Sequence, residues 1–174
     1  MVEFIKKINH YESQLYIKIL SLSRNKLFYT KFHLKDTFQN RINLIFLHTA
    51  FLLIMLQTKD KDQFYMKFYQ RIFDTIFKNI ELNMREIGYG DIMINKNMRF
   101  LVKVFYNILL NCKNYSKKNL KNKNLFLFRF LDLNIDKKTH NNIVLVDYFN
   151  KYQIFCLDLS LDNVLKGNLN FVYK

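Results

Sequence analysis

The chain has 174 residues, of which 50% are hydrophobic and 17% are aromatic, and it carries 28 Lys and Arg against 14 Asp and Glu. This length corresponds to one domain, and so much apolar material excludes wholesale disorder. With 3 Gly, no Pro and 2 Cys, the composition excludes collagen-like and disulfide-scaffold proteins and argues against a turn-rich β-sandwich. We therefore predict an all-α fold: a single-domain multi-helix bundle with short connections over residues 1–174.

The formal net charge of +14 suggests an acidic partner such as nucleic acid, a ribosome or anionic lipid. A second interpretation stays open, because Lys, Asn, Ile, Phe and Tyr also accumulate when a gene is AT-rich. The positive charge could then be drift on a solvated surface. Either origin favours salt-sensitive association with polyanions.

The cysteines and the first residues of the sequence indicate the cellular compartment in which we expect the protein. Cys112 and Cys156 occur without a Cys-x-x-Cys motif or a histidine at ligand spacing, so we expect two reduced thiols and no metal or cofactor. Residues 1–13 mix charges and contain no apolar run, so we expect neither a secretory signal nor a transit peptide.

The first predicted helix covers residues 11–22, where apolar residues recur at helical spacing: Tyr11, Leu15, Ile19 and Leu22. Ser23 is expected to cap a short turn that extends to Phe32.

A central helix is predicted over residues 36–57. Asp36 to Gln39 has the form of a capping box, with Asp36 as the cap. The apolar run from Ile42 to Leu56 has 15 residues, whereas a spanning helix needs ~20, and it is interrupted by polar residues including His48. We therefore predict a buried core helix and no transmembrane span.

The next helix is predicted over residues 63–87, with an apolar stripe of Phe73, Ile76, Phe77, Ile80, Met84 and Ile87. Its other face offers two acid-first pairs at i,i+4, Asp74 with Lys78 and Glu81 with Arg85.

The clearest turn signal in the sequence follows at residues 88–91. Gly88 is expected to end the helix with a positive φ, and Gly90 to let the chain reverse. Asp91 or Asn95 is expected to cap a helix over residues 96–112, which should lie beside its neighbours because the connections are short.

The C-terminal part, residues 125–172, is predicted to be helical but is less clearly patterned. Before it, residues 114–124 contain Lys117, Lys118, Lys121 and Lys123, which could form a mobile loop, a polyanion-contact arm or a solvated helix end. Residues 125–135 suit a buried helix or a strand, and alternation around Leu159 mimics a strand; we predict helix for both. Gly167 should close a last short helix.

The polar residues that are candidates for catalysis are His48, Asp74, Glu81, Arg85, Glu86 and Asp91. Pairing with basic neighbours explains Asp74 and Glu81, and a hydrogen-bonded core position explains His48. No nucleophile has a visible base, and metal-ligand spacings and phosphate-binding glycine patterns are absent. Basic residues interleave with aromatics along 26–32 and 61–69, a pattern that suits stacking on bases but equally suits a core. We therefore predict that the protein is not an enzyme.

The segment from Leu15 to Asn111 resembles the ubiquinol–cytochrome c chaperone family. The resemblance is carried by Ser23-Arg24, Phe28-Tyr29, Asp36-Thr37, Arg41, Leu47-His48, Phe73-Asp74, Phe77, Lys96 and Phe105-Tyr106, and above all by the run from Met84 to Asp91. The family-like core covers about residues 11–112. Asn40 and Asn107 stand where many members have glycine, Asn79 replaces an acid, and Tyr89 is bulkier than the usual residue.

This resemblance implies a non-enzymatic assembly factor for the cytochrome bc1 complex that binds newly made cytochrome b, an apolar client. It implies work in the bacterial cytoplasm, with contact at the inner membrane, or alternatively in the mitochondrial matrix. The alternative function is a basic helical RNA- or ribosome-binding protein. The candidate partner surface comprises Asp36, Arg41, His48, Asp74, Arg85, Glu86, Gly88, Gly90 and Asp91, with Asp36 and Asp91 expected as caps and Arg41 and Arg85 as buried ion-pair members.

Overall fold

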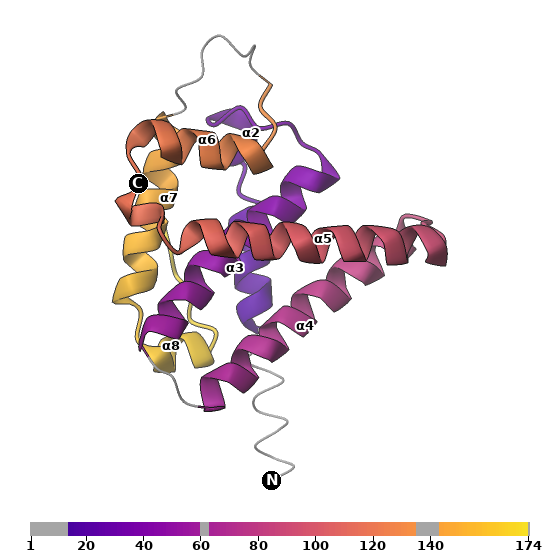
Figure 1. The fold of residues 1–174 in the computed structure, drawn as a ribbon, viewed down its shortest axis with the longest axis horizontal. Helices are drawn as coiled ribbons and strands as arrows, with labels where there is room; N and C mark the ends of the chain where they lie inside the picture. Colours follow the sequence, from indigo (N-terminus) through magenta and orange to yellow (C-terminus); the bar gives the residue numbers. More distant parts are fainter. Residues whose placement is uncertain (1–13, 60–62, 135–142, 174) are drawn as a thin grey trace.

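The computed structural model describes residues 14–59, 63–134 and 143–173 (Figure 1). Helical residues 14–23 are followed by α2 (Leu27–Thr30), α3 (Phe38–Lys59), α4 (Gln63–Glu86), α5 (Asp91–Cys112), the 3-10 turn η1 (Tyr115–Lys117), α6 (Leu120–Phe130), α7 (Ile143–Asp158) and α8 (Leu161–Leu165). Within these ranges the only extended pairing is an isolated bridge between Leu34 and Leu133. The predicted all-α fold is confirmed.

Helix α3 is the centre of the bundle and contacts α4, α5 and α7. Every residue from 42 to 53 is buried, which explains why this stretch is apolar on nearly all sides. By length and composition alone, Phe38–Gln57 could cross a membrane, but 83% of its apolar window is buried inside the fold. The sequence prediction of a buried core helix is confirmed.

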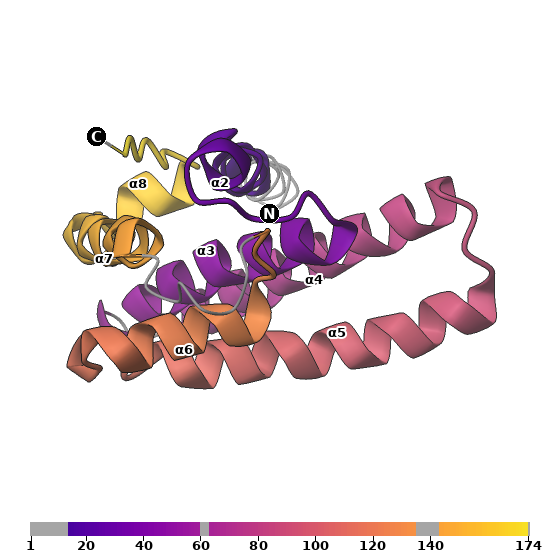
Figure 2. The ribbon, with the colours of Figure 1, turned by 90° about the horizontal axis from the view of Figure 1, so that it is seen from above.

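The remaining helices form layers on the two sides of α3. In Figure 2, α5 and α6 lie along one side, and helical residues 14–23, α2 and α8 lie on the other. At residues 87–90 the chain turns and reverses its direction from α4 into α5. Aromatic rings of both helices pack against α3. The ring centroid of Phe46 lies 5.4 Å from that of Phe77 and 5.2 Å from that of Phe105.

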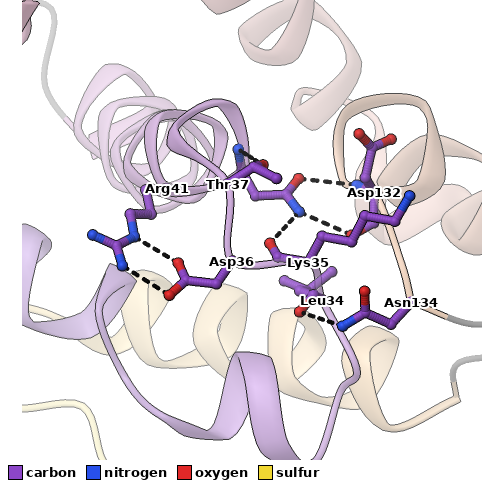
Figure 3. Close-up of polar contacts among 8 residues, drawn as sticks. Leu34, Lys35, Asp36, Thr37, Arg41, Asp132 and Asn134 are labelled. Carbon is purple, nitrogen blue, oxygen red and sulfur yellow. Dashed lines mark hydrogen bonds and ion pairs between the residues drawn. The ribbon is translucent and has the colours of Figure 1, made fainter.

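A buried asparagine ties the start of α3 to the segment after α6 (Figure 3). The Asn40 Nδ2 group donates to the carbonyls of Lys35 at 2.7 Å and Asp132 at 2.9 Å, and Asn40 Oδ1 accepts from the Asp132 backbone amide at 2.9 Å. The Leu34–Leu133 bridge continues the same connection. Because Asn40 is 1% exposed, its own amide needs these partners, and the three bonds join two segments that are far apart in the sequence.

We expect Asn40→Ala to lower the free energy of unfolding by about 2 kcal/mol, because the Asp132 amide loses its acceptor and the carbonyls of Lys35 and Asp132 each lose one of two donors. Urea denaturation of the full chain measures this. Asn79→Ala is the control, since Asn79 Nδ2 bonds only to the Thr75 carbonyl within its own helix, and its cost should stay below about 1 kcal/mol. Equal losses in the two variants would contradict the assignment.

Gly167 closes α8 and meets the N-terminal part of the chain. Its φ is +70°, and the amide of Asn168 donates to the Asn163 carbonyl at 2.8 Å, as at a glycine-terminated helix. A Cβ atom at this position would lie 2.9 Å from Gln14 Cβ and 3.2 Å from the Leu15 amide nitrogen. The predicted helix end at Gly167 is confirmed, and only glycine fits this approach without displacement.

The C-terminal helices differ in detail from the sequence prediction. Part of the Lys- and Asn-rich segment is the start of α6, whose N-cap Asn119 Oδ1 accepts from the Asn122 amide at 2.9 Å. Helix α6 ends at Phe130 rather than at residue 135, and residue 135 lies outside the described residues. The strand-like alternation near Leu159 spans the break between α7 and α8, where Ser160 caps α8.

Candidate binding groove

Arg41 and Asp36 form an exposed ion pair at the start of α3 (Figure 3). Arg41 Nε and Nη2 donate to the two Asp36 oxygens at 2.7 and 2.8 Å, and this hydrogen bonding lowers the pKa of the Asp36 carboxyl. The side chains are 52% and 51% exposed, so the prediction that Arg41 belongs to a buried pair is wrong.

The cap of α3 is Thr37 and not Asp36. Thr37 Oγ1 accepts from the Asn40 amide at 3.2 Å, because the helix begins at Phe38 and Asn40 is its third residue. Gln39 does not complete a capping box, since its side chain donates to Asn43 Oδ1 at 3.0 Å. The predicted cap is therefore displaced by one residue, which frees Asp36 to bind Arg41.

The turn between α4 and α5 follows the glycine prediction closely. Gly88 has φ +90°, its amide donates to the Arg85 carbonyl at 2.9 Å, and the Tyr89 amide donates to the Met84 carbonyl at 3.0 Å. These two bonds define a Schellman motif. Gly90 is extended at φ −73° and is itself the N-cap of α5, so Asp91 is the first residue of that helix and not its cap.

Arg85 joins the two helices across this turn. It bonds to Glu81 Oε1 at 2.9 Å, as predicted, and to Asp91 Oδ1 at 2.5 Å; hydrogen bonding to Glu81 and then Asp91 raises the pKa of the guanidinium. Arg85 is about half exposed, so the prediction of a buried pair is wrong. Exposed pairs stabilise little, and this one chiefly fixes the direction of the turn.

We expect Gly88→Ala to lower the free energy of unfolding by about 1–2 kcal/mol, because alanine at positive φ is strained. Gly90→Ala is the matched control in the same turn: its φ is negative and no atom lies within 4 Å of an added Cβ. Its effect should be smaller, about 0.5 kcal/mol, because only an N-cap glycine is replaced and no positive φ is involved. Thermal unfolding followed by circular dichroism compares the two, and equal losses would contradict this account of the turn.

His48 lies in the core, where it is 0% exposed. Its Nδ1 lies 2.7 Å from the Leu44 carbonyl and its Nε2 lies 2.8 Å from the Tyr148 hydroxyl. A carbonyl only accepts, so Nδ1 carries the proton and Nε2 accepts from Tyr148. Burial lowers the pKa of His48 to about 4, which keeps the ring neutral. The hydrogen-bonded core position expected for His48 is confirmed.

An apolar groove of about 340 Å³ lies between helical residues 14–23, the start of α3 and the end of α4. Its lining is Leu20, Ser23, Arg24, Phe38, Arg41, Ile42, Ile45, Ile80, Asn83, Glu86 and Ile87. A second hollow of about 290 Å³, lined by Arg24, Tyr29 and Arg41, shares two of these residues. Aliphatic walls with a few charged groups are typical of a site that binds an apolar segment and fixes its orientation.

The structure brings together only part of the predicted partner surface. Arg41 and Glu86 line the groove, and the turn at Gly88 begins one residue after Ile87, which also lines it. Asp74 is not a groove residue; it accepts from Gln70 Nε2 at 2.8 Å, and among the described residues no ion pair joins it to Lys78. Where the chain is described, no group of three or more His, Cys, Asp and Glu could hold a metal ion.

Sequence reasoning did not select the groove's aliphatic walls, Leu20, Ile45 and Ile80. Each fits an apolar helical stripe and is indistinguishable from core by pattern alone. The available signal was Ser23-Arg24, which belongs to the resemblance and stands at the end of the helix that forms one wall.

The lysines at the start of α6 are not equivalent. Lys123 Nζ donates to Asn150 Oδ1 at 2.8 Å and lies 4.9 Å from the Tyr115 ring centroid, and burial lowers its pKa. It therefore packs against α7, whereas Lys117 and Lys121 are exposed.

Comparisons with known proteins agree with this arrangement. The profile described as Ubiquinol-cytochrome C chaperone matches residues 30–123, which include Arg41 and the whole turn between α4 and α5. The fold is similar to the crystal structure of the Cbp3 homolog from Brucella abortus, with a TM-score of 0.82 and 22% identity over 98% of this chain and 93% of that one. A search of curated proteins gives no match. Because the profile covers more than half of the chain, this protein belongs to the ubiquinol–cytochrome c chaperone family.

Proposed function

We propose that this protein binds an apolar segment of newly made cytochrome b in the groove beside Arg41 and releases it during assembly, with no covalent step. Membership of the family makes the protein a chaperone for assembly of the bc1 complex. The client, the non-enzymatic mechanism and a site of action at the inner membrane are our proposal. The observation that carries it is the groove itself, an aliphatic hollow rimmed by Arg41 and Glu86.

The dimensions of the groove fit side-chain anchors. A volume of about 340 Å³ accommodates a few apolar side chains, so a client helix would lie across the opening and insert residues of one face. Phe38 and Ile87 are exposed beside the aliphatic walls and would cover such a helix. Charged groups at the rim would orient the client without drawing water into the apolar floor.

The proposal is tested by placing a photoreactive amino acid at position 87 in the native host. Cytochrome b should crosslink there but not from position 154, because Ile87 and Ile154 are 60% and 59% exposed on different helices, α7 carrying the second. Crosslinking from both positions, or from position 154 alone, would overturn the groove as the client site.

We further expect Ile87→Asp to weaken client binding about tenfold, because one buried isoleucine side chain contributes ~1.5 kcal/mol or more. Ile154→Asp is the matched control. In a strain lacking the wild-type gene, Ile87→Asp should lower cytochrome b and bc1 activity while other membrane complexes persist. Normal bc1 levels with a stable Ile87→Asp protein would contradict the proposed function.

A further inference from the structure

The distribution of charge along the chain is strongly uneven. Residues 92–131 contain nine basic residues and no acidic one: Lys96, Arg99, Lys103, Lys113, Lys117, Lys118, Lys121, Lys123 and Arg129. These nine account for most of the net charge of +14, although the segment is less than a quarter of the chain.

The fold places this segment on one side of the molecule, because 92–131 comprises nearly all of α5, η1 and α6 (Figure 2). Seven exposed residues recur at steps of three and four along α5 and its C-cap, which puts them on one face of the helix: Ile92, Lys96, Arg99, Lys103, Tyr106, Leu110 and Lys113. Exposed Lys117, Lys121, Leu125 and Arg129 continue it into η1 and α6. We name these eleven residues the α5–α6 face.

The positive charges of the α5–α6 face are not neutralised within the protein. Among the described residues, none of its basic side chains forms an ion pair. The acidic residues at the two ends of the segment do not neutralise these charges. Asp91 is paired with Arg85, and Asp132 follows α6. An unbalanced basic face of this kind attracts a polyanionic surface.

The two helices also share a basic hollow of about 290 Å³ at the end of α5. Its lining combines Lys118 and Arg129 with the amides of Asn111 and Asn122, and Leu125 and Phe126 form its apolar side. Cationic and amide donors next to exposed leucine match a phosphate headgroup with acyl chains beneath it.

We propose that the α5–α6 face docks the protein on the surface of an anionic lipid bilayer. Exposed aliphatic residues favour lipid over nucleic acid: Ile92 is 89% exposed and Leu110 is 63% exposed among the lysines, and both are more exposed than Tyr106, at 47%. Aliphatic side chains do not stack on bases, but they enter the headgroup region of a membrane while neighbouring lysines bind its phosphates. This inference does not depend on the client groove, which α3, α4 and residues 14–23 form.

Flotation of the purified full chain with vesicles tests the proposal. The protein should float with phosphatidylcholine vesicles that contain phosphatidylglycerol, not with phosphatidylcholine alone, and high salt should release it. The triple variant Lys96→Gln, Arg99→Gln, Lys103→Gln should bind at least about tenfold more weakly, since each basic residue near the surface contributes to binding. Ile92→Ser with Leu110→Ser should weaken binding without changing the salt dependence.

The matched control is Lys18→Gln, Lys26→Gln, Lys31→Gln, which removes the same charge from the layer on the opposite side of α3 (Figure 2). It should bind vesicles like the wild type. Equal loss in both triple variants would show a net-charge effect and overturn the α5–α6 face. Failure to float with anionic vesicles, while the face variants lose RNA binding in a filter assay, would overturn lipid as the partner. Circular dichroism confirms that each variant is folded.

Discussion

His48→Ala is expected to lower the free energy of unfolding by about 4 kcal/mol. The ring is fully buried, and its centroid lies 4.8 Å from that of Tyr152, 5.6 Å from that of Phe149 and 5.7 Å from that of Tyr148. Alanine would leave a cavity among these rings and would deprive the buried Tyr148 hydroxyl of its acceptor. Both losses act at the contact between α3 and α7, which lie far apart in the sequence.

Chemical denaturation of His48→Ala, Tyr148→Phe and the double variant measures the two contributions separately. Tyr148→Phe removes only the hydroxyl and should cost about 1 kcal/mol. The double variant should cost less than the sum, because the hydrogen bond between the two side chains is lost only once. Additive losses would show that the 2.8 Å contact between Nε2 and the Tyr148 hydroxyl does not stabilise the fold.

The same histidine should make the protein sensitive to acid. Burial lowers its pKa from 6.5 to about 4, so between these values the unfolded chain binds a proton at His48 that the folded chain does not. Stability therefore falls as the pH falls through this window, and about 3 kcal/mol is lost by its lower end. Unfolding free energies measured at several pH values across the window should show this slope.

His48→Gln is the control for the acid effect, since glutamine can accept a hydrogen bond but does not titrate. Its stability should be nearly independent of pH over the window. Asp36 and Asp147, whose pKa values are lowered by hydrogen bonds from Arg41 and Lys151, also begin to lose stability near the lower end of the window, but wild type and His48→Gln share that loss. The same slope in wild type and His48→Gln would refute the role of His48.

Local features of the sequence predicted much of the fold. Gly88 was predictable because a positive φ at a helix end nearly requires glycine, and Glu81 with Arg85 was predictable because the helix itself sets their spacing. The buried position of α3 was predictable because its apolar run has no continuous polar face.

Features that depend on distant partners were not predictable in the same way. Asn40 looked like a departure from the family, yet its amide bonds to Asp132, 92 residues later. Asp36 and Asp91 have the chemistry of helix caps, but each binds a nearby arginine instead, and no local pattern distinguishes the two roles. The bounds of α7 within the predicted helical part were not given by the sequence, because Leu145, Val146, Tyr148 and Phe149 are buried in close succession, which leaves little helical periodicity to detect.

The contact of Gly167 with Gln14 and Leu15 has a consequence for biosynthesis. The helix that carries Leu20, and so forms one wall of the groove, lies against the turn at Gly167. During translation this wall emerges from the ribosome long before the turn that packs against it. The wall is therefore supported from that side only once the chain has been made as far as Gly167.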